Sequence, residues 1–200
     1  MRIGLIRHGL TDWNVAGRIQ GRSDIPLNEE GRLQAKLLGE RLLTEPYEWD
    51  YIITSGLSRA QETGEIISRI INVPMLPPDE RLQERSFGQA EGLTQEEREA
   101  KWGVDWNLLD LGQEKEPDMR VRALTFINEL AQTHPHQHIL VVSHGALLAQ
   151  LYKALYEDRY NERIGNLSLT ILENEEEKWN PLLYNCTKHL MECSFEKSKK

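Results

Sequence analysis

Three short apolar segments of this chain each precede a longer segment with helical periodicity, and this alternation limits the fold more than any other feature. The expected strands are Arg2–Arg7, Tyr51–Thr54 and His138–Ser143, and the expected helices are 28–43, Ser58–Ile71 and 146–156. Short buried strands that alternate with helices form a largely parallel sheet with helices packed on it. The pattern therefore predicts an α/β fold, a three-layer sandwich with a mainly parallel central sheet.

Residues 114–134 are expected to form one further, long helix. Pro117 suits its first turn, and four apolar residues recur on the face expected to point inward: Val121, Leu124, Ile127 and Leu130.

Two more strands are expected near the end of the chain, at 167–173 and 178–184, joined by the acidic turn 174–177. No internal repeat and no break in composition marks a second domain. The chain is therefore expected to be a single domain over residues 1–200, in which 185–200 is a candidate for a flexible tail.

The chain is acidic, with 24 Lys and Arg against 32 Asp and Glu and a formal net charge of −8. This balance argues against a nucleic-acid-binding protein, which normally carries a basic excess on one face. No apolar run is long enough for a membrane span, and Arg7 and His8 interrupt the apolar start too soon for a signal peptide. Cys186 and Cys193 match no zinc or redox spacing, so reduced thiols in a cytoplasmic protein are expected.

Basic side chains follow each of the first three expected strands. Arg7 and His8 end the first strand, Arg59 comes a few residues after the second, and His144 directly follows the third. Ligands of an open α/β sheet bind at the carboxyl ends of its strands. Two arginines and two histidines are therefore expected at one edge of the sheet, where they form a locally positive site for an anion.

A phosphoryl group fits this set of side chains best. A guanidinium offers a planar fork of donors and stays charged, so it can stabilise the charge that shifts during phosphoryl transfer. A neutral His8 can attack phosphorus, and Gly9 beside it lets a phosphate approach the backbone. Glu84, in the expected loop 83–92, is the candidate general acid for the leaving alkoxide, and its ionised form can then activate water.

The sequence resembles the histidine phosphatase superfamily, which contains the cofactor-dependent phosphoglycerate mutases and many broad-specificity phosphatases. Five segments in family order carry the resemblance: RHGLTDWN, GRIQGRSDIPLNEEGRLQA, TSGLSRAQET, RLQERSFGQAEG and VVSHG. The resemblance implies a nucleophile at His8, with Arg7, Arg59 and His144 holding the phosphoryl group, and Glu84 as the proton donor. It also implies that Asn14, Gln20 and Gly21 line the phosphate site, and that the protein uses no metal or other cofactor.

The alternatives to an enzyme are a metal-binding protein and a non-catalytic protein that binds phosphorylated ligands. His134, His136 and His138 suggest a metal-binding protein, but they precede the strand at the end opposite the expected site, and no carboxylate or cysteine completes a ligand set. A polar turn is the favoured interpretation of these histidines. A non-catalytic protein that binds phosphorylated ligands would lack one of the charged residues, and none is missing.

Hydrolysis is preferred over the mutase reaction on the basis of the resemblance. The family's mutases carry a long basic insertion between the proton-donor loop and the second histidine, whereas this interval is acidic here. Ser86 and Phe87 stand where mutases show histidine and tyrosine, and Ala146 stands where they carry asparagine. The sequence therefore predicts a phosphomonoester hydrolase that acts on small phosphorylated metabolites, with a phosphoglycerate mutase as the alternative.

The surface that selects the substrate is expected in residues 94–119, which include Trp102 and Trp106, with the tail 185–200 as a further candidate. Whether the two tryptophans belong to the core or line the mouth of the pocket is left open. Arg18 and Arg22 are interpreted as solvated surface charge outside the site. The expected partner is a small phosphorylated substrate, with no nucleic acid and no membrane, and the oligomeric state is left open.

Overall fold

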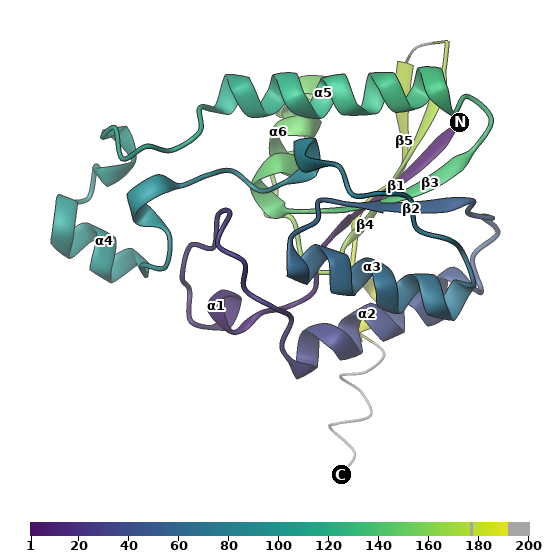
Figure 1. The fold of residues 1–200 in the computed structure, drawn as a ribbon. Helices are drawn as coiled ribbons and strands as arrows, with labels where there is room; N and C mark the ends of the chain where they lie inside the picture. Colours follow the sequence, from purple (N-terminus) through teal and green to yellow (C-terminus); the bar gives the residue numbers. More distant parts are fainter. Residues whose placement is uncertain (177, 192–200) are drawn as a thin grey trace.

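A five-stranded mixed sheet forms the centre of the computed structural model, which describes residues 1–176 and 178–191 (Figure 1). Its strands are β1 (Arg2–Arg7), β2 (Tyr51–Thr54), β3 (His138–Ser143), β4 (Leu169–Glu175) and β5 (Lys178–Cys186), in the order β2-β3-β1-β4-β5. β1 and β2 both pair parallel to β3, and β4 is antiparallel to β1 and to β5. Only β4 therefore runs against the common direction, and the predicted α/β fold is confirmed.

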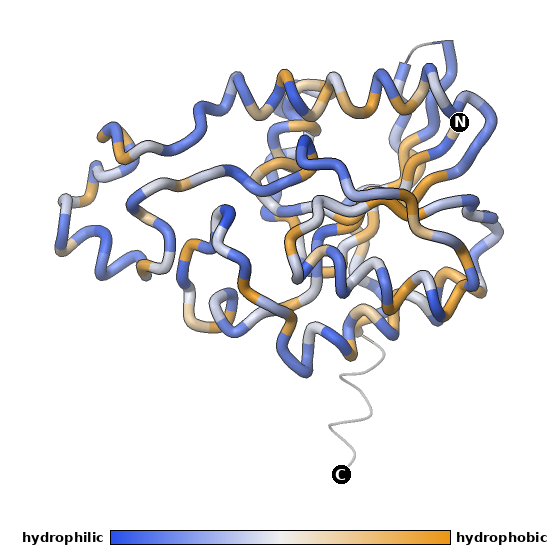
Figure 2. The backbone as a smooth tube through the Cα atoms, viewed as in Figure 1, coloured by the Kyte–Doolittle hydropathy of each residue, from blue (hydrophilic) through white to orange (hydrophobic). Residues whose placement is uncertain are grey.

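Helices cover both faces of this sheet, because its central strands are apolar on both faces. On one side lie α5 (Glu116–Thr133) and α6 (Gly145–Tyr156), and on the other lie α2 (Glu29–Leu42) and α3 (Ser58–Ile71) (Figure 1). In β3, Ile139 and Val141 join the α5–α6 core, whereas Leu140 and Val142 join the α2–α3 core. This alternation is the period of two of a strand, and the hydropathy colouring shows the apolar residues gathered in the sheet (Figure 2).

The predicted helices are present, but the face of α5 that was predicted to be buried is partly wrong. The Asn28 side chain caps α2 by accepting from the Gly31 N–H at 2.9 Å, and Pro117 lies in the first turn of α5. Val121, predicted to face inward, is instead 65% exposed. The buried face of α5 is displaced around the helix and consists of Met119, Ala123, Phe126, Ile127 and Leu130.

Several short elements were not predicted from the sequence. They are α1 (Asp12–Val15), α4 (Gln95–Trp102) and the 3-10 helices η1 (Glu80–Leu82), η2 (Gly88–Ala90), η3 (Trp106–Leu108) and η4 (Glu157–Arg159). In α4 only Arg98 is buried, so the helix has no apolar stripe that the pattern could reveal. A capping box between Thr94 and Glu97 fixes its start instead.

The end of the chain differs from the expectation in two ways. β4 begins at Leu169 rather than at 167, because Leu167 has a φ of +52° and cannot continue a strand. Residues 185–191, assigned to a candidate flexible tail, include structured positions: Asn185 and Cys186 belong to β5, and His189 is only 4% exposed, whereas Met191 is 65% exposed. Residues 192–200, including Cys193, lie outside the described residues, as does position 177 of the expected acidic turn.

Within residues 1–176 and 178–191, no helix is both long enough and apolar enough to cross a bilayer.

Candidate active site

The sheet register brings three distant parts of the chain to one edge. Arg7 at the end of β1 is opposite Ser143 in β3, and Thr54 at the end of β2 is opposite Val142. His8 follows directly and donates its backbone N–H to the Ser143 carbonyl at 3.0 Å. His144 is the next residue after β3, and its ring lies beside that of His8, with the centroids 5.1 Å apart. The strand ends therefore bring both predicted histidines together.

The His8 imidazole is buried and is fixed in one tautomer. Its Nδ1 is 2.7 Å from the Gly9 carbonyl oxygen, which can only accept, so Nδ1 carries the proton and Nε2 keeps its lone pair. Burial lowers the pKa of His8 well below its usual value, and the charges of Arg7 and Arg59 lower it further. His8 is thus a neutral imidazole with a free Nε2 lone pair.

Arg7 and Arg59 are buried cations without an ion pair among the described residues. Arg7 donates to the Ile164 carbonyl at 2.7 Å, and Arg59 donates to the carbonyls of Gly21 and Ser23 at 2.7 and 2.8 Å. The Nε atoms of both guanidinium groups are buried and have no hydrogen-bond partner. Burial lowers the pKa of Arg7 to about 10 and also lowers that of Arg59, while the charge of Glu84 partly offsets both effects. Two buried positive charges with free donors favour the binding of an anion.

His144 is fully buried and has one occupied ring nitrogen. Its Nε2 lies 2.7 Å from the hydroxyl of Ser55, and its Nδ1 is buried without a hydrogen-bond partner. Burial lowers the pKa of His144 well below its usual value, with Arg59 as the next cause, so this ring is neutral too. When the Ser55 hydroxyl donates to Nε2, Nδ1 carries the proton and is a free donor.

The predicted phosphate-site amides, Asn14 and Gln20, are both oriented by Thr11, which is fully buried. The Thr11 N–H donates to Asn14 Oδ1 at 3.2 Å, so the end of Asn14 that faces Thr11 is its oxygen. The Thr11 hydroxyl lies 3.1 Å from the same oxygen and 2.9 Å from Gln20 Oε1. Both amides therefore turn their oxygens toward Thr11, and their NH₂ groups point away from it as donors.

Gly21 lies where the backbone turns sharply against Glu91. Its φ is +55°, and a Cβ at this position would collide with the Glu91 carboxylate. That carboxylate accepts the backbone N–H groups of Arg22, Ser23 and Phe87 at 3.0 to 3.1 Å. Glu91 therefore binds the loop that carries Gln20 and Gly21 to the loop that carries Glu84.

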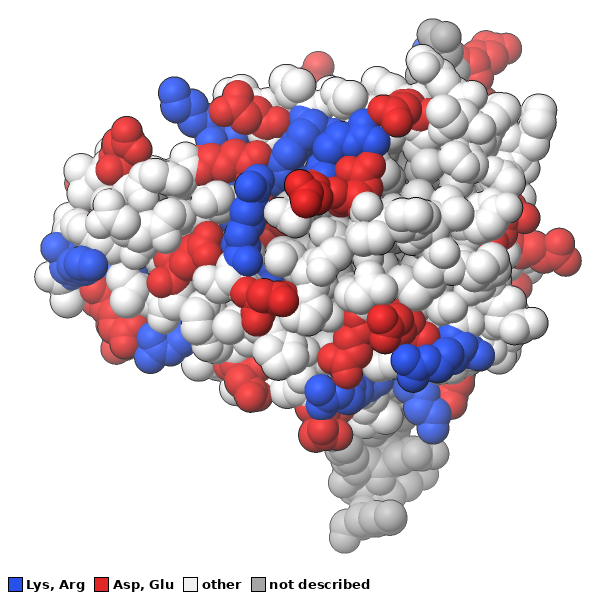
Figure 3. Space-filling view, viewed as in Figure 1, with Lys and Arg blue, Asp and Glu red and all other residues white. Residues whose placement is uncertain are grey.

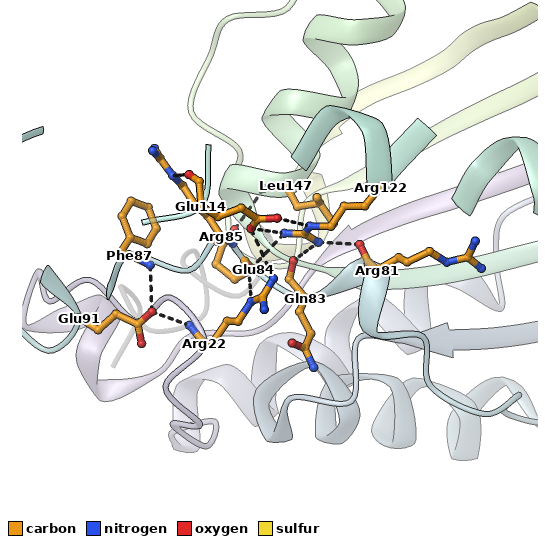
Figure 4. A network of polar contacts seen from close by, with 10 residues as sticks. All are labelled: Arg22, Arg81, Gln83, Glu84, Arg85, Phe87, Glu91, Glu114, Arg122 and Leu147. Carbon is orange, nitrogen blue, oxygen red and sulfur yellow. Dashed lines mark hydrogen bonds and ion pairs between the residues drawn. The ribbon is translucent and has the colours of Figure 1, made fainter. Parts of the chain in front are cut away.

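The Glu84 carboxylate lies at the N-terminus of α6, next to His144. It accepts the backbone N–H group of Ala146 at 3.2 Å. It also accepts those of Leu147 at 3.1 Å and Arg85 at 2.9 Å (Figure 4). No ion pair joins Glu84 to Arg81 or Arg85 among the described contacts: Arg81 pairs with Asp79 and Glu129, and Arg85 donates to the Glu114 carbonyl. A role for Glu84 as a simple salt-bridge partner is therefore not supported.

The other histidine cluster has separate, local contacts. His138 Nδ1 lies 3.0 Å from the Glu48 carbonyl, and His134 Nδ1 lies 2.8 Å from the Thr133 hydroxyl. In the described part of the chain, no three His, Cys, Asp or Glu side chains gather in a way that could hold a metal ion.

Sequence reasoning missed four residues that position the site: Thr11, Ser55, Glu91 and Asn166. Asn166 donates to the His8 carbonyl at 3.0 Å and so fixes the backbone at His8, the predicted nucleophile. Thr11, Ser55 and Glu91 lie inside the segments that carry the family resemblance, and this was the available signal. Asn166 lies outside those segments, and no local pattern marks it.

Two buried arginines gathered with a neutral imidazole and a carboxylate at the strand ends are the arrangement of a phosphoryl-transfer enzyme. The sequence matches the histidine phosphatase superfamily (branch 1) over residues 3–187. The chain belongs to this superfamily.

The most similar relatives include phosphatases. The uncharacterized phosphatase PhoE of Bacillus subtilis is 34% identical, over 93% of this chain and 95% of its own. Bacillus stearothermophilus YhfR superposes with a TM-score of 0.86 at 31% identity, covering 94% of this chain and 98% of its own. A mycobacterial glucosyl-3-phosphoglycerate phosphatase in complex with VO3 superposes with a TM-score of 0.82 at 28% identity, covering 92% and 99%. Other relatives are named phosphoglycerate mutases.

Proposed function

We propose that the protein hydrolyses phosphomonoesters of small metabolites through a covalent phosphohistidine at His8. The single observation that carries this proposal is the pairing of a neutral, tautomerically fixed His8 with two buried guanidinium groups that have free donors. An imidazole lone pair attacks phosphorus only when it is unprotonated, and the cations supply the charge that the phosphoryl oxygens need.

In the first step, His8 Nε2 forms a bond to phosphorus while the bond to the ester oxygen breaks. Arg7 and Arg59 bind the phosphoryl oxygens, together with His144 Nδ1 and the amide NH₂ groups of Asn14 and Gln20. Glu84 gives its proton to the leaving oxygen, so that an alcohol leaves rather than an alkoxide. The products of this step are the free alcohol, a phosphorylated His8 and an ionised Glu84.

In the second step, a water molecule attacks the phosphorus of phosphohistidine. Glu84, now a carboxylate, takes the proton of this water, the bond between phosphorus and Nε2 breaks, and inorganic phosphate leaves. The two steps return His8 and Glu84 to their starting states. The proposal places this chemistry in one domain over residues 1–200, in the cytoplasm, without a metal ion.

The test is phosphate release from a panel of phosphomonoesters that includes 2- and 3-phosphoglycerate. We expect steady release of phosphate from several substrates, with little interconversion of the two phosphoglycerates. Interconversion that is stimulated by 2,3-bisphosphoglycerate and outruns phosphate release would establish the mutase instead.

A further inference from the structure

Arg22, interpreted from the sequence as solvated surface charge, lies along the edge of the site. The carbonyl oxygen of Gly21, the residue before Arg22, accepts a hydrogen bond from the Arg59 guanidinium at 2.7 Å. The Arg22 side chain then reaches the proton-donor loop, where Nε donates to the Glu84 carbonyl at 3.4 Å (Figure 4). Arg22 therefore spans from the phosphoryl-binding arginine to the residue proposed to protonate the leaving group.

The backbone and the guanidinium of Arg22 are held very differently. The backbone N–H donates to Glu91 Oε1 at 3.1 Å, inside the contact that joins the two loops. The side chain is 45% exposed and makes only long contacts, of 3.4 Å to Glu84 and 3.5 Å to Glu114 Oε2. A side chain whose backbone is fixed and whose guanidinium makes only long contacts is suited to bind a ligand.

Arg22 shares its carboxylate neighbour, Glu114, with a second arginine that binds it at shorter distances. Arg122 already binds both oxygens of Glu114, with Nε to Oε1 at 2.7 Å and its NH2 group to Oε2 at 2.9 Å. Arg22 is therefore a second cation on a carboxylate that is already paired. The space-filling view shows basic atoms gathered in one band across this face, with acidic atoms around it (Figure 3).

The remaining charges around Arg22 are also engaged elsewhere. The Glu91 carboxylate accepts hydrogen bonds from backbone N–H groups and, at 2.7 Å, from the Ser23 hydroxyl. Glu84 faces the backbone of α6, and Arg85 donates to the Glu114 carbonyl while its guanidinium stacks over the Phe87 ring. Among the described contacts, Arg22 thus has no carboxylate that it does not share with another arginine.

We propose that Arg22 binds an anionic group, a carboxylate or a second phosphate, on the alcohol part of the substrate. This inference rests on the proposed function. The oxygen that receives the proton from Glu84 belongs to the leaving alcohol, so the rest of that alcohol extends from Glu84, where Arg22 lies. The substrates that this site selects are therefore phosphomonoesters whose alcohol carries its own negative charge.

The test compares two substrates of similar size, 3-phosphoglycerate and glycerol 1-phosphate, which differ by a carboxylate in place of a hydroxymethyl group. Wild-type protein should prefer 3-phosphoglycerate. In Arg22→Ala, the ratio of kcat/KM for the two substrates should fall by about 10- to 100-fold, since a hydrogen bond to a charged group is lost. The loss should appear mainly in KM, because the contact is the same before and during transfer.

Arg18→Ala is the matched control. Arg18 lies four residues earlier and pairs with Glu97 at 2.7 Å, with no contact to Glu84, so its loss should leave the ratio unchanged. Arg22→Gln, which keeps part of the stem and removes the charge, should repeat the result of Arg22→Ala if the alanine variant folds poorly.

Three results have distinct meanings. An equal loss on both substrates in Arg22→Ala and Arg22→Gln would show that Arg22 only supports the loops and would overturn the inference. A wild-type preference for glycerol 1-phosphate would also overturn it. Absence of hydrolysis of every substrate by the wild-type protein would instead contradict the proposed function.

Discussion

The imidazole rings of His8 and His144 face one another across two adjacent strand ends, with centroids 5.1 Å apart and planes inclined by 52°. Burial lowers the pKa of each ring and the charges of the nearby arginines lower it further, so neither ring is charged at neutral pH. The two rings differ in what holds them. His8 has its Nδ1 proton on a carbonyl and a free Nε2, whereas the Nε2 of His144 is occupied by Ser55. This difference assigns the nucleophile to His8 in our proposal.

His8→Ala should lower phosphatase activity by roughly a thousandfold or more, because the covalent route is lost. Rapid quenching at alkaline pH followed by mass spectrometry should find phosphate on the wild-type peptide that contains His8. His136→Ala, at an exposed histidine, is the control and should keep full activity. Substantial turnover by His8→Ala would rule out the phosphohistidine.

Glu84→Gln should slow alkyl phosphates far more than aryl phosphates, by about 10²- to 10⁴-fold for alkyl esters, because a basic alkoxide needs a proton to leave. The measurement is kcat/KM for both classes, with Glu97→Gln at the surface as the control. Equal losses on the two classes would assign Glu84 to structural support of α6.

Activity should survive dialysis against EDTA, since Arg7, Arg59 and His144 supply the positive charge and donors that Mg²⁺ supplies in other phosphoryl-transfer enzymes. The rate before and after dialysis, with and without added Mg²⁺ or Zn²⁺, is the measurement. Loss of activity that either ion restores would mean that the reaction depends on a metal.

Thr11→Val should raise KM, and the inhibition constant of inorganic phosphate, by roughly 10-fold, because the shape is kept while the hydroxyl that holds Gln20 and Asn14 is lost. Thr11→Ser keeps that hydroxyl and should restore both constants. Folding of each variant is checked by thermal unfolding. If Thr11→Val bound phosphate as tightly as the wild type, the proposed orienting role would be wrong.

His189 should make the protein less stable in mild acid. Burial, with the charge of Arg41 beside it, lowers the pKa of His189 to about 4, whereas an unfolded histidine titrates near 6.5. Below pH 6.5 the unfolded chain therefore binds a proton that the folded protein does not, and stability falls until about pH 4. Between pH 7 and pH 5 the free energy of unfolding should fall by about 1 to 2 kcal/mol more in the wild type than in His189→Asn.

Urea unfolding of both proteins at the two pH values measures this difference. His136→Asn, at an exposed position, should behave as the wild type does. A difference between His189→Asn and the wild type that is the same at both pH values would show that His189 does not titrate as described.

The sequence was sufficient for the strand-end residues because strand ends can be read from apolar runs. Arg7, His8, Arg59 and His144 each lie at or just after such a run, and parallel pairing then brings them together. A local sequence pattern does not show which distant residues a side chain will contact in the fold. Nothing near Arg22 in the sequence shows that its neighbour Glu114 is already paired with Arg122, so the sequence indicates an ordinary surface charge at Arg22.

Val121 shows a different limit. The apolar residues of α5 are frequent enough that two neighbouring phases fit them almost equally well. Only the packing of Met119 and Phe126 against the sheet decides which face turns inward, and that choice leaves Val121 in solvent.

The sheet order also has a consequence for synthesis of the chain. β1, which begins at Arg2, pairs on either side with β3 and β4. Among the residues that the structure describes, β2 pairs only with β3 and, through an isolated bridge, with Met75. The first half of a nascent chain therefore contains His8 but no strand to hold it beside Arg59. Strand pairings between residues so far apart in the sequence are slow to form, and His8 is not brought beside His144 until residues as far as His144 have left the ribosome. Regain of activity after dilution from denaturant should accordingly be among the last signals to return.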